Sequence, residues 1–268
     1  MLLLLIACKA PPADPEFNDA AVEAIRQFNA EDPVVLAFAV RQLESVLADV
    51  DPDGSLVDRS SEPERLTDAD VDGYGEHPDL DPALAIGVSV THFSAEPMAG
   101  HVRVQTLADQ TPIEPNSPEV YDRILLEGAD CWADVSCEFL RTENPLIKDN
   151  AAMTLDYTLW KDFRWVDLNL PSPSEVPDGE TATNDGDPRW AIVGTSWIKE
   201  ETVAQDGTSI LQSYSLEVWI PSDDGTLRNM ALWSETDSSF SEDIIASTTR
   251  SGIQGIFDAA DEWLVENP

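Results

Sequence analysis

The sequence has few basic residues, because 15 Lys and Arg stand against 52 Asp and Glu over 268 residues, a formal charge of −37. Only four of the basic residues are lysine. A surface of this charge repels nucleic acid and anionic lipid head groups, so neither is expected to bind. Solubility explains such a surface, and a cationic ligand is the alternative.

Signatures of common enzyme classes are missing as well. The sequence contains no G-x-S-x-G, H-E-x-x-H, phosphate-binding loop or G-x-G-x-x-G. His92 is a candidate general base, but spacing gives it neither a nucleophile nor an orienting carboxylate. Glu235 and Asp237 resemble the paired carboxylates of glycosidases, which leaves a hydrolase of surface polymers as the alternative function. We expect a binding or envelope-structural protein and assign no catalytic residue.

Cysteine is scarce, and long apolar runs are absent after the first residues. No later segment approaches the ~20 apolar residues that a membrane-spanning helix needs. Cys131 and Cys137 are close in sequence and most simply form a small disulfide loop in an oxidising compartment, at the turn between a helix and the next strand. Neither a metal site nor a thiol-redox site is expected there, since the C-x-x-C spacing is absent.

The first nine residues form an apolar run that ends in cysteine and lysine, M-L-L-L-L-I-A-C-K. Leu5-Ile6-Ala7-Cys8 resembles the lipobox of bacterial lipoproteins. The resemblance implies that residues 1–7 are a signal peptide and that Cys8 receives the lipid, with palmitate among its acyl chains. The alternative is a frayed N-terminus with one buried cysteine.

Residues 8–16 carry three prolines and read as an extended tether behind the lipidated cysteine. Lys9 follows Cys8 where lipoproteins of the inner membrane usually have aspartate, so the resemblance implies the outer membrane. We therefore expect a lipid-anchored protein of the bacterial cell envelope, periplasmic or surface-exposed. Its partners are the membrane, through the anchor, and an apolar small molecule or an envelope protein.

The spacing of apolar residues predicts a helical hairpin over residues 17–50. One helix follows Asn18, and Asp32-Pro33 predicts the start of a second, as N-cap and first helical residue. Residues 51–83 are rich in Asp, Pro, Gly and Ser and are expected to form an acidic linker. The apolar positions of the two helices are Ala21, Val22, Ile25, Phe28, Leu36, Val40, Leu43 and Leu47.

Residues 84–268 predict an antiparallel α+β domain. Alternating residues indicate a sheet of about six to seven strands, and Asp223-Asp224-Gly225 indicates a hairpin turn. A wide apolar stripe predicts a long C-terminal helix from about Ser241. A short helix is expected at 120–126. The expected strands are 85–93, 135–140, 153–160, 163–168, 190–198, 210–220 and 227–233.

This order of elements over residues 84–266 resembles the helix-grip or START-like architecture. The resemblance implies a curved sheet wrapped around the last helix, with an apolar cavity for a lipid between them. Cystatin-like and lipocalin-like folds are the alternatives, and the same side chains could simply fill a core. The eight tryptophans leave a similar choice between a core and an aromatic binding platform.

Two aspartate runs, residues 49–54 and 68–73, both read D-x-D-x-D-G and resemble the start of EF-hand calcium loops. The twelfth position is Ser60 in the first run, where Glu is expected, and Asp79 in the second. Solvated loop aspartates are the alternative to a calcium-dependent adhesion module, and no other cofactor is expected. The candidate ligands are Asp49, Asp51, Asp53, Asp68, Asp70 and Asp72.

Overall fold

The computed structural model describes residues 17–47, 63–115, 117, 123–149, 154–176, 182–184, 186–204 and 208–268. One eight-stranded sheet has the order β1-β8-β7-β5-β4-β3-β2, with β6 paired to β7. Every pair is antiparallel, so the α+β class is confirmed. The strands are β1 (Ile86–Ser94), β2 (Ile124–Glu127), β3 (Phe139–Asp149), β4 (Thr154–Asp167), β5 (Trp190–Ile198), β6 (Thr202–Val203), β7 (Ser209–Ser222) and β8 (Gly225–Asp237). The α-helices are α1 (Phe17–Gln27), α2 (Pro33–Leu47), α3 (Asp68–Val71), α4 (Met98–Thr106) and α5 (Glu242–Glu266). The 3-10 turns are η1 (Pro82–Leu84), η2 (Thr111–Ile113) and η3 (Pro173–Glu175).

Helices α1 and α2 form the expected hairpin and cover one face of the sheet, here called the hairpin face. Strand residues alternate between the two faces, so every second side chain of a strand points to the hairpin face. Phe28, just after α1, and Leu43 of α2 share a core with Leu216 of β7 and Trp233 of β8. On this face β5 contributes Ala191, Val193 and Trp197, and β7 contributes Tyr214, Leu216, Val218 and Ile220.

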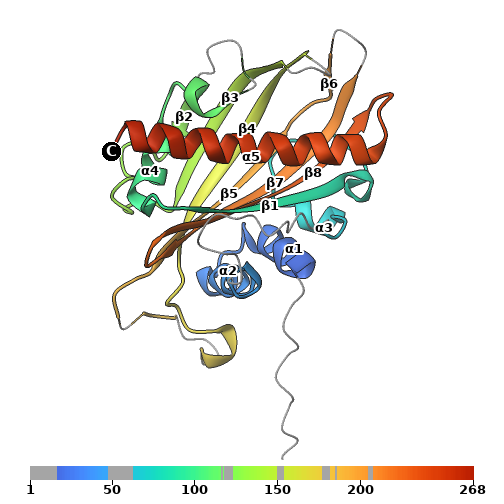
Figure 1. Cartoon of the computed structure of the whole chain (residues 1–268). Helices are drawn as coiled ribbons and strands as arrows, with labels where there is room; N and C mark the ends of the chain where they lie inside the picture. The colour runs from blue at the N-terminus through green and yellow to red at the C-terminus, as the bar shows by residue number, and fades with distance from the viewer. Residues whose placement is uncertain are drawn as a thin grey trace, which may run out of the picture.

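Helix α5 crosses the opposite face, here called the α5 face (Figure 1). Ile253 and Phe257 pack on Val88 and Val90 of β1 and on Met230 of β8. A second apolar cluster lies further along the sheet and contains Val102, Trp132, Leu140, Phe163, Ile192 and Trp219. The sheet is therefore covered on both faces.

Several local predictions hold. Asp223 and Asp224 form the two-residue turn between paired Ser222 and Gly225. Gly225 is required there, since its φ is +155° and a Cβ would lie 2.1 Å from the Ser94 carbonyl oxygen. The predicted strand over 190–198 coincides with β5, and the terminal helix begins one residue after Ser241.

Other local predictions are wrong. The helix expected at 120–126 conflicts with β2, in which Leu125 packs inward while Ile124 lies exposed at the sheet edge. Tertiary pairing overrides local spacing in so short a segment. The strands expected at 153–160 and 163–168 are one strand, β4, and residues 135–138 form the turn before β3. Helix α4 was not anticipated.

Candidate functional site

The α5 face carries opposite charges among apolar neighbours. Lys161 of β4 donates from Nζ to Oε1 of Glu217 on β7 at 3.0 Å. The two side chains keep 9% and 11% of their accessible surface. Phe163 and Trp219 lie two residues further along the same strands and belong to the apolar cluster of this face. Strand alternation therefore places the ion pair on the α5 face too.

Two serines extend this polar group across the sheet. Ser196 of β5 lies opposite Lys161 in the strand register, and Ser215 of β7 lies opposite Ser196. Their hydroxyl groups are 2.6 Å apart and hydrogen-bonded, and both side chains are buried. Three neighbouring strands thus offer hydrogen-bond donors and acceptors at one place on the α5 face.

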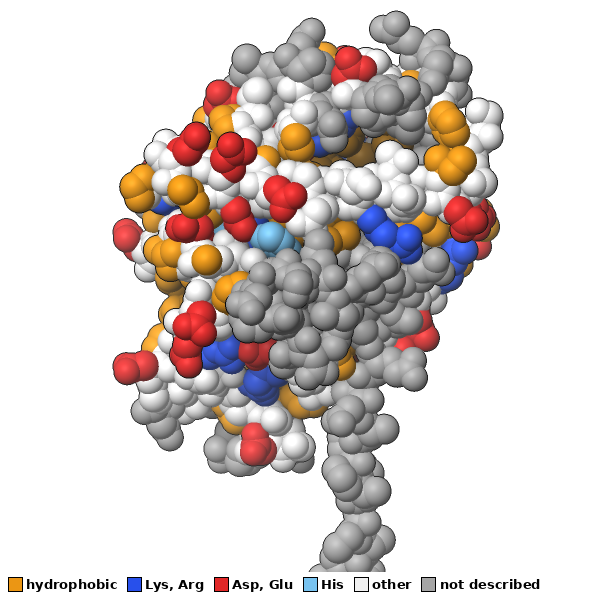
Figure 2. Space-filling model, viewed as in Figure 1, with side chains coloured by type: hydrophobic (Ala, Val, Ile, Leu, Met, Phe, Trp, Pro, Cys, Tyr) orange, Lys and Arg blue, Asp and Glu red, His pale blue; other side chains and the backbone are white. Residues whose placement is uncertain are grey.

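Next to this polar group, toward the N-terminal end of β4, side chains keep part of their accessible surface. Tyr157 and Leu159 are half-buried, although Leu155, closer to the strand end, is only 3% exposed. Burial raises the pKa of the Tyr157 hydroxyl above its ordinary value. The surface beside α5 is hollowed, with apolar and basic side chains at its floor (Figure 2). This hollow is called the recess below. Strand alternation and register place Tyr157, Leu159, Lys161, Ser196 and Glu217 together on the face of the sheet beside it.

Aromatic side chains close the inner end of the recess. Gly194 lies opposite both Phe163 and Glu217 in the register. A Cβ there would lie 2.7 Å from Phe163 Cδ1 and 3.4 Å from Trp219 Cζ3. The glycine therefore lets the two rings approach, with centroids 6.0 Å apart, beside the Glu217 carboxylate.

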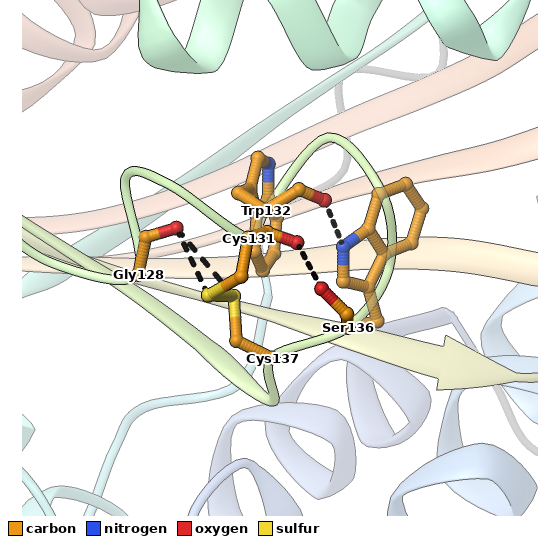
Figure 3. Close-up of a disulfide and its surroundings, with 6 residues drawn as sticks. Gly128, Cys131, Trp132, Ser136 and Cys137 are labelled. Atoms are coloured by element: carbon orange, nitrogen blue, oxygen red, sulfur yellow. Dashed lines mark hydrogen bonds between the residues drawn. A yellow bond between two sulfur atoms is a disulfide. The ribbon is translucent and has the colours of Figure 1, made fainter.

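The disulfide between Cys131 and Cys137 closes the turn between β2 and β3. The expected place, after a helix, is therefore wrong, because β2 precedes the turn. Gly128 begins the turn with a φ of +83°, and its carbonyl oxygen accepts hydrogen bonds from the backbone N–H groups of Cys131 and Trp132. Figure 3 shows the two bonded sulfur atoms beside this carbonyl group. A Cβ at Gly128 would lie 2.0 Å from the Phe139 carbonyl oxygen, so only glycine fits.

This disulfide loop inserts Trp132 into the core of the α5 face. The indole is fully buried, and its Nε1 donates to Gln105 Oε1 of α4 at 2.9 Å. The Trp132 carbonyl oxygen accepts from Trp165 Nε1 at 3.0 Å, and the two ring centroids are 5.1 Å apart. The loop thus joins α4 to β4 at the closed end of the recess.

A second polar cluster fastens α5 to the sheet. Asp261 of α5 accepts from His92 Nε2 at 2.7 Å, from Ser94 Oγ at 2.8 Å and from Arg228 Nη1 at 3.3 Å. Gln254 Nε2 lies 3.3 Å from His92 Nδ1. Asp261 is thus the orienting carboxylate that spacing could not assign to His92. Because Ser94 donates to the carboxylate and not to the imidazole, these residues do not form a nucleophilic triad.

The charges of this cluster depend on one another. Burial alone would raise the pKa of Asp261, but hydrogen bonds from His92 and Ser94 and the charge of Arg228 outweigh it and lower that pKa. Burial lowers the pKa of Arg228 to about 10, so the guanidinium remains charged at neutral pH. Burial, together with the Arg228 charge, lowers the pKa of nearby His101 to about 3, so that imidazole is neutral.

The second aspartate run forms helix α3 and its cap. Asp70 Oδ1 accepts from Arg26 Nε at 2.7 Å, and its Oδ2 accepts from the backbone N–H and hydroxyl of Thr67. Asp68 and Asp72 are exposed. Within the described residues, no group of three or more His, Cys, Asp or Glu is placed to hold a metal ion.

Some predicted sites lie outside the described residues, namely Cys8, Asp49, Asp51 and Asp53. Lipidation of Cys8 and calcium binding by either aspartate run therefore stay predictions, and calorimetric titration with calcium tests the second. In the part of the chain that the structure describes, no helix has the length and apolar character to cross a membrane.

The remaining candidates face away from the recess. Glu235 lies on the hairpin face by strand alternation and accepts from Gln212 Nε2 at 2.6 Å, whereas Asp237 is exposed at the end of β8. None of the eight tryptophans is exposed. The indoles of Trp197 and Trp233 on the hairpin face donate to backbone carbonyl oxygens. Six of the eight therefore pack in the cores of the two faces, and the half-buried Trp190 and Trp263 form no exposed row.

No protein-family model and no curated protein matches the chain. Solved structures share its arrangement of sheet and helices. A protein of Thermus thermophilus is 11% identical with a TM-score of 0.44, over 68% of this chain and 98% of its own. A STAR-related lipid transfer protein from Xanthomonas axonopodis is 13% identical, with a TM-score of 0.42 over 68% and 86%. An aromatase/cyclase from Streptomyces sp. R1128 is 12% identical, with a TM-score of 0.39 over 66% and 92%.

The fold is a helix-grip fold. Lys161 and Glu217 were missed in the sequence because 56 residues separate them, and strand register cannot be read from composition. The available signal was Lys161 itself, one of only four lysines, set in the apolar stretch L-W-K-D-F-R-W-V.

Proposed function

We propose that this domain binds an amphiphilic small molecule in the recess, with the polar end of the ligand against Lys161 and Glu217. We also propose that Cys8 carries a lipid that holds the domain at the outer membrane. The first proposal is supported mainly by the buried ion pair beside an accessible, partly apolar hollow. The second is supported by the lipobox resemblance and the proline-containing tether.

The ion pair is difficult to explain by stability alone. Moving two charges out of water costs several kcal/mol each, and a hydrophobic pair of similar volume is often as stable or more stable. The same strands already supply apolar neighbours, Leu159, Phe163 and Trp219, so an apolar pair would suit the site. A polar group of a ligand gives the charges a role that an apolar core does not need.

Binding can be tested with N-phenyl-1-naphthylamine, an uncharged probe that fluoresces in apolar surroundings. We expect saturable binding to the purified domain. Leu159→Trp fills the recess and should weaken probe binding at least tenfold. Thr158→Trp is the matched control, because the neighbouring residue points to the hairpin face and should leave the affinity within about twofold.

Both variants need the same fold for this comparison, which circular dichroism and thermal unfolding check. Tyr157→Trp is a second variant in the recess with a smaller increase in volume, should Leu159→Trp not fold. Absence of saturable binding to the wild type would contradict the proposal. Equal binding by the folded recess variant and its control would contradict it as well.

A further inference from the structure

The recess presents one positive side chain, Lys161, and one negative side chain, Glu217, to a bound molecule. Lys161 has three N–H donors, of which one is bound to Glu217 Oε1. The carboxylate of Glu217 has room for several hydrogen bonds on its two oxygens, and Lys161 Nζ donates one of them to Oε1. The pair therefore offers a donor and an acceptor side by side while carrying no net charge.

Three kinds of polar end can meet such a pair. A hydroxyl group accepts from Lys161 Nζ and donates to Glu217, and the ion pair stays intact. A carboxylate is repelled by Glu217, and an ammonium group by Lys161. Either charged group would have to separate the pair, which leaves one buried charge without its partner. The buried hydroxyl groups of Ser196 and Ser215 add neutral partners and no charge.

We propose that the recess selects amphiphiles with an uncharged, hydroxyl-bearing polar end, such as long-chain alcohols and monoacylglycerols, over fatty acid anions and alkylammonium cations. This inference rests on the proposed function. It adds the chemical class of the ligand, which follows from the charge balance of Lys161 and Glu217. The half-buried Tyr157 and Leu159 provide the apolar contacts for the chain of the ligand.

The experiment is a competition in which ligands of one chain length displace N-phenyl-1-naphthylamine. The competitors are dodecanol, monolauroylglycerol, laurate and dodecylammonium, each below its micelle concentration. Measurements at about 0.3 M salt screen the field of the acidic surface, because the Debye length falls below 10 Å there. For the wild type, we expect monolauroylglycerol and dodecanol to bind at least tenfold more tightly than laurate and dodecylammonium.

Removing one charge should reverse the selectivity in a direction set by the remaining charge. Glu217→Gln leaves Lys161 and should favour laurate by at least tenfold relative to the wild type. Lys161→Met leaves Glu217 and should favour dodecylammonium to a similar degree. The matched control is Arg141→Met, because Arg141 pairs with Asp162 on the hairpin face of neighbouring strands and should keep the wild-type order.

The outcomes separate the two proposals. If no competitor and no probe binds the folded wild type, the proposed function fails. If ligands bind but laurate or dodecylammonium binds most tightly to the wild type, the inference on ligand class is overturned while the binding function stands. Should one of the single-charge variants not fold, the other carries the test alone. A folded single-charge variant that keeps the wild-type order of affinities would also overturn the inference.

Discussion

Replacement of Asp261 by asparagine should weaken the attachment of α5 to the sheet and lower the stability of the domain. The variant keeps the size of the side chain and removes the charge that Arg228 faces. Arg228 is buried, so the loss leaves a guanidinium inside the protein without its carboxylate partner. Breaking a buried pair in this way costs about 3–5 kcal/mol, and we take the lower value because the Asp261 side chain is 25% exposed.

A loss of about 3 kcal/mol corresponds to a fall in Tm of roughly 6–12 °C for a domain of this size. Urea unfolding followed by tryptophan fluorescence measures the free energy, since buried tryptophans lie in the cores of both faces. The control is Asp258→Asn, one turn earlier on α5. Asp258 is exposed and accepts a hydrogen bond from Gln254 on the same helix, so its replacement should change stability by less than about 0.5 kcal/mol.

The pKa of Asp261 determines how the stability loss in Asp261→Asn should change with pH. The pKa of Asp261 is lower in the folded chain than the value of about 3.9 expected when unfolded. Its ionised form therefore contributes stability that is fully present above about pH 4 and is lost as the pH falls through the folded pKa. The difference between wild type and Asp261→Asn should shrink below pH 4. A difference that is the same at pH 7 and pH 3, or no larger than that of Asp258→Asn, would refute this explanation.

Three further outcomes are expected. Wild-type cells should incorporate radiolabelled palmitate into a membrane-bound protein, and Cys8→Ser should abolish both the label and the membrane retention; equal retention would exclude lipidation as the anchor. The double variant Cys131→Ser, Cys137→Ser should lose about 2 kcal/mol in urea unfolding, because a short loop is released, and a loss under 0.5 kcal/mol would contradict that. Gly194→Ala should lower the free energy of unfolding by about 1–3 kcal/mol, because the added methyl group overpacks against the aromatic rings. Gly252→Ala, where a Cβ meets nothing within 4 Å, should not destabilise the domain, and equal values for the two variants would show that the ring contacts do not matter.

Strongly periodic segments made the architecture predictable. Ile253, Phe257 and Leu264 recur at helical spacing and mark α5, and alternation in β7 placed Leu216 and Trp219 on opposite faces, as the core clusters confirm. Short segments failed because their environment decides their structure. Pro145 of β3, for example, lies outside the segment that pairs with β2, at an open edge of the sheet. Proline is tolerated at such an edge, but the neighbouring sequence does not reveal where the edge is.

The functional residues were less predictable than the fold, for a physical reason. Each polar cluster joins groups that are distant in sequence, such as His92 and Asp261, 169 residues apart. Their encounter depends on strand order and on where α5 crosses the sheet. In a chain with 52 acidic residues, neither Glu217 nor Asp261 stands out by composition. Only burial distinguishes them.

The two faces of the sheet differ in how much they contribute to the stability of the domain. The hairpin face has a continuous apolar layer that includes Phe28, Leu43 and Trp233, so it can stabilise the fold by burial of apolar surface alone. The α5 face is then free to keep polar groups that contribute little to stability. Lys161 and Glu217 occupy its middle, and Asp261 fastens the helix at its edge. A domain stabilised from one face can tolerate a recess in the other, and this asymmetry is the physical argument for the proposed ligand site beside α5.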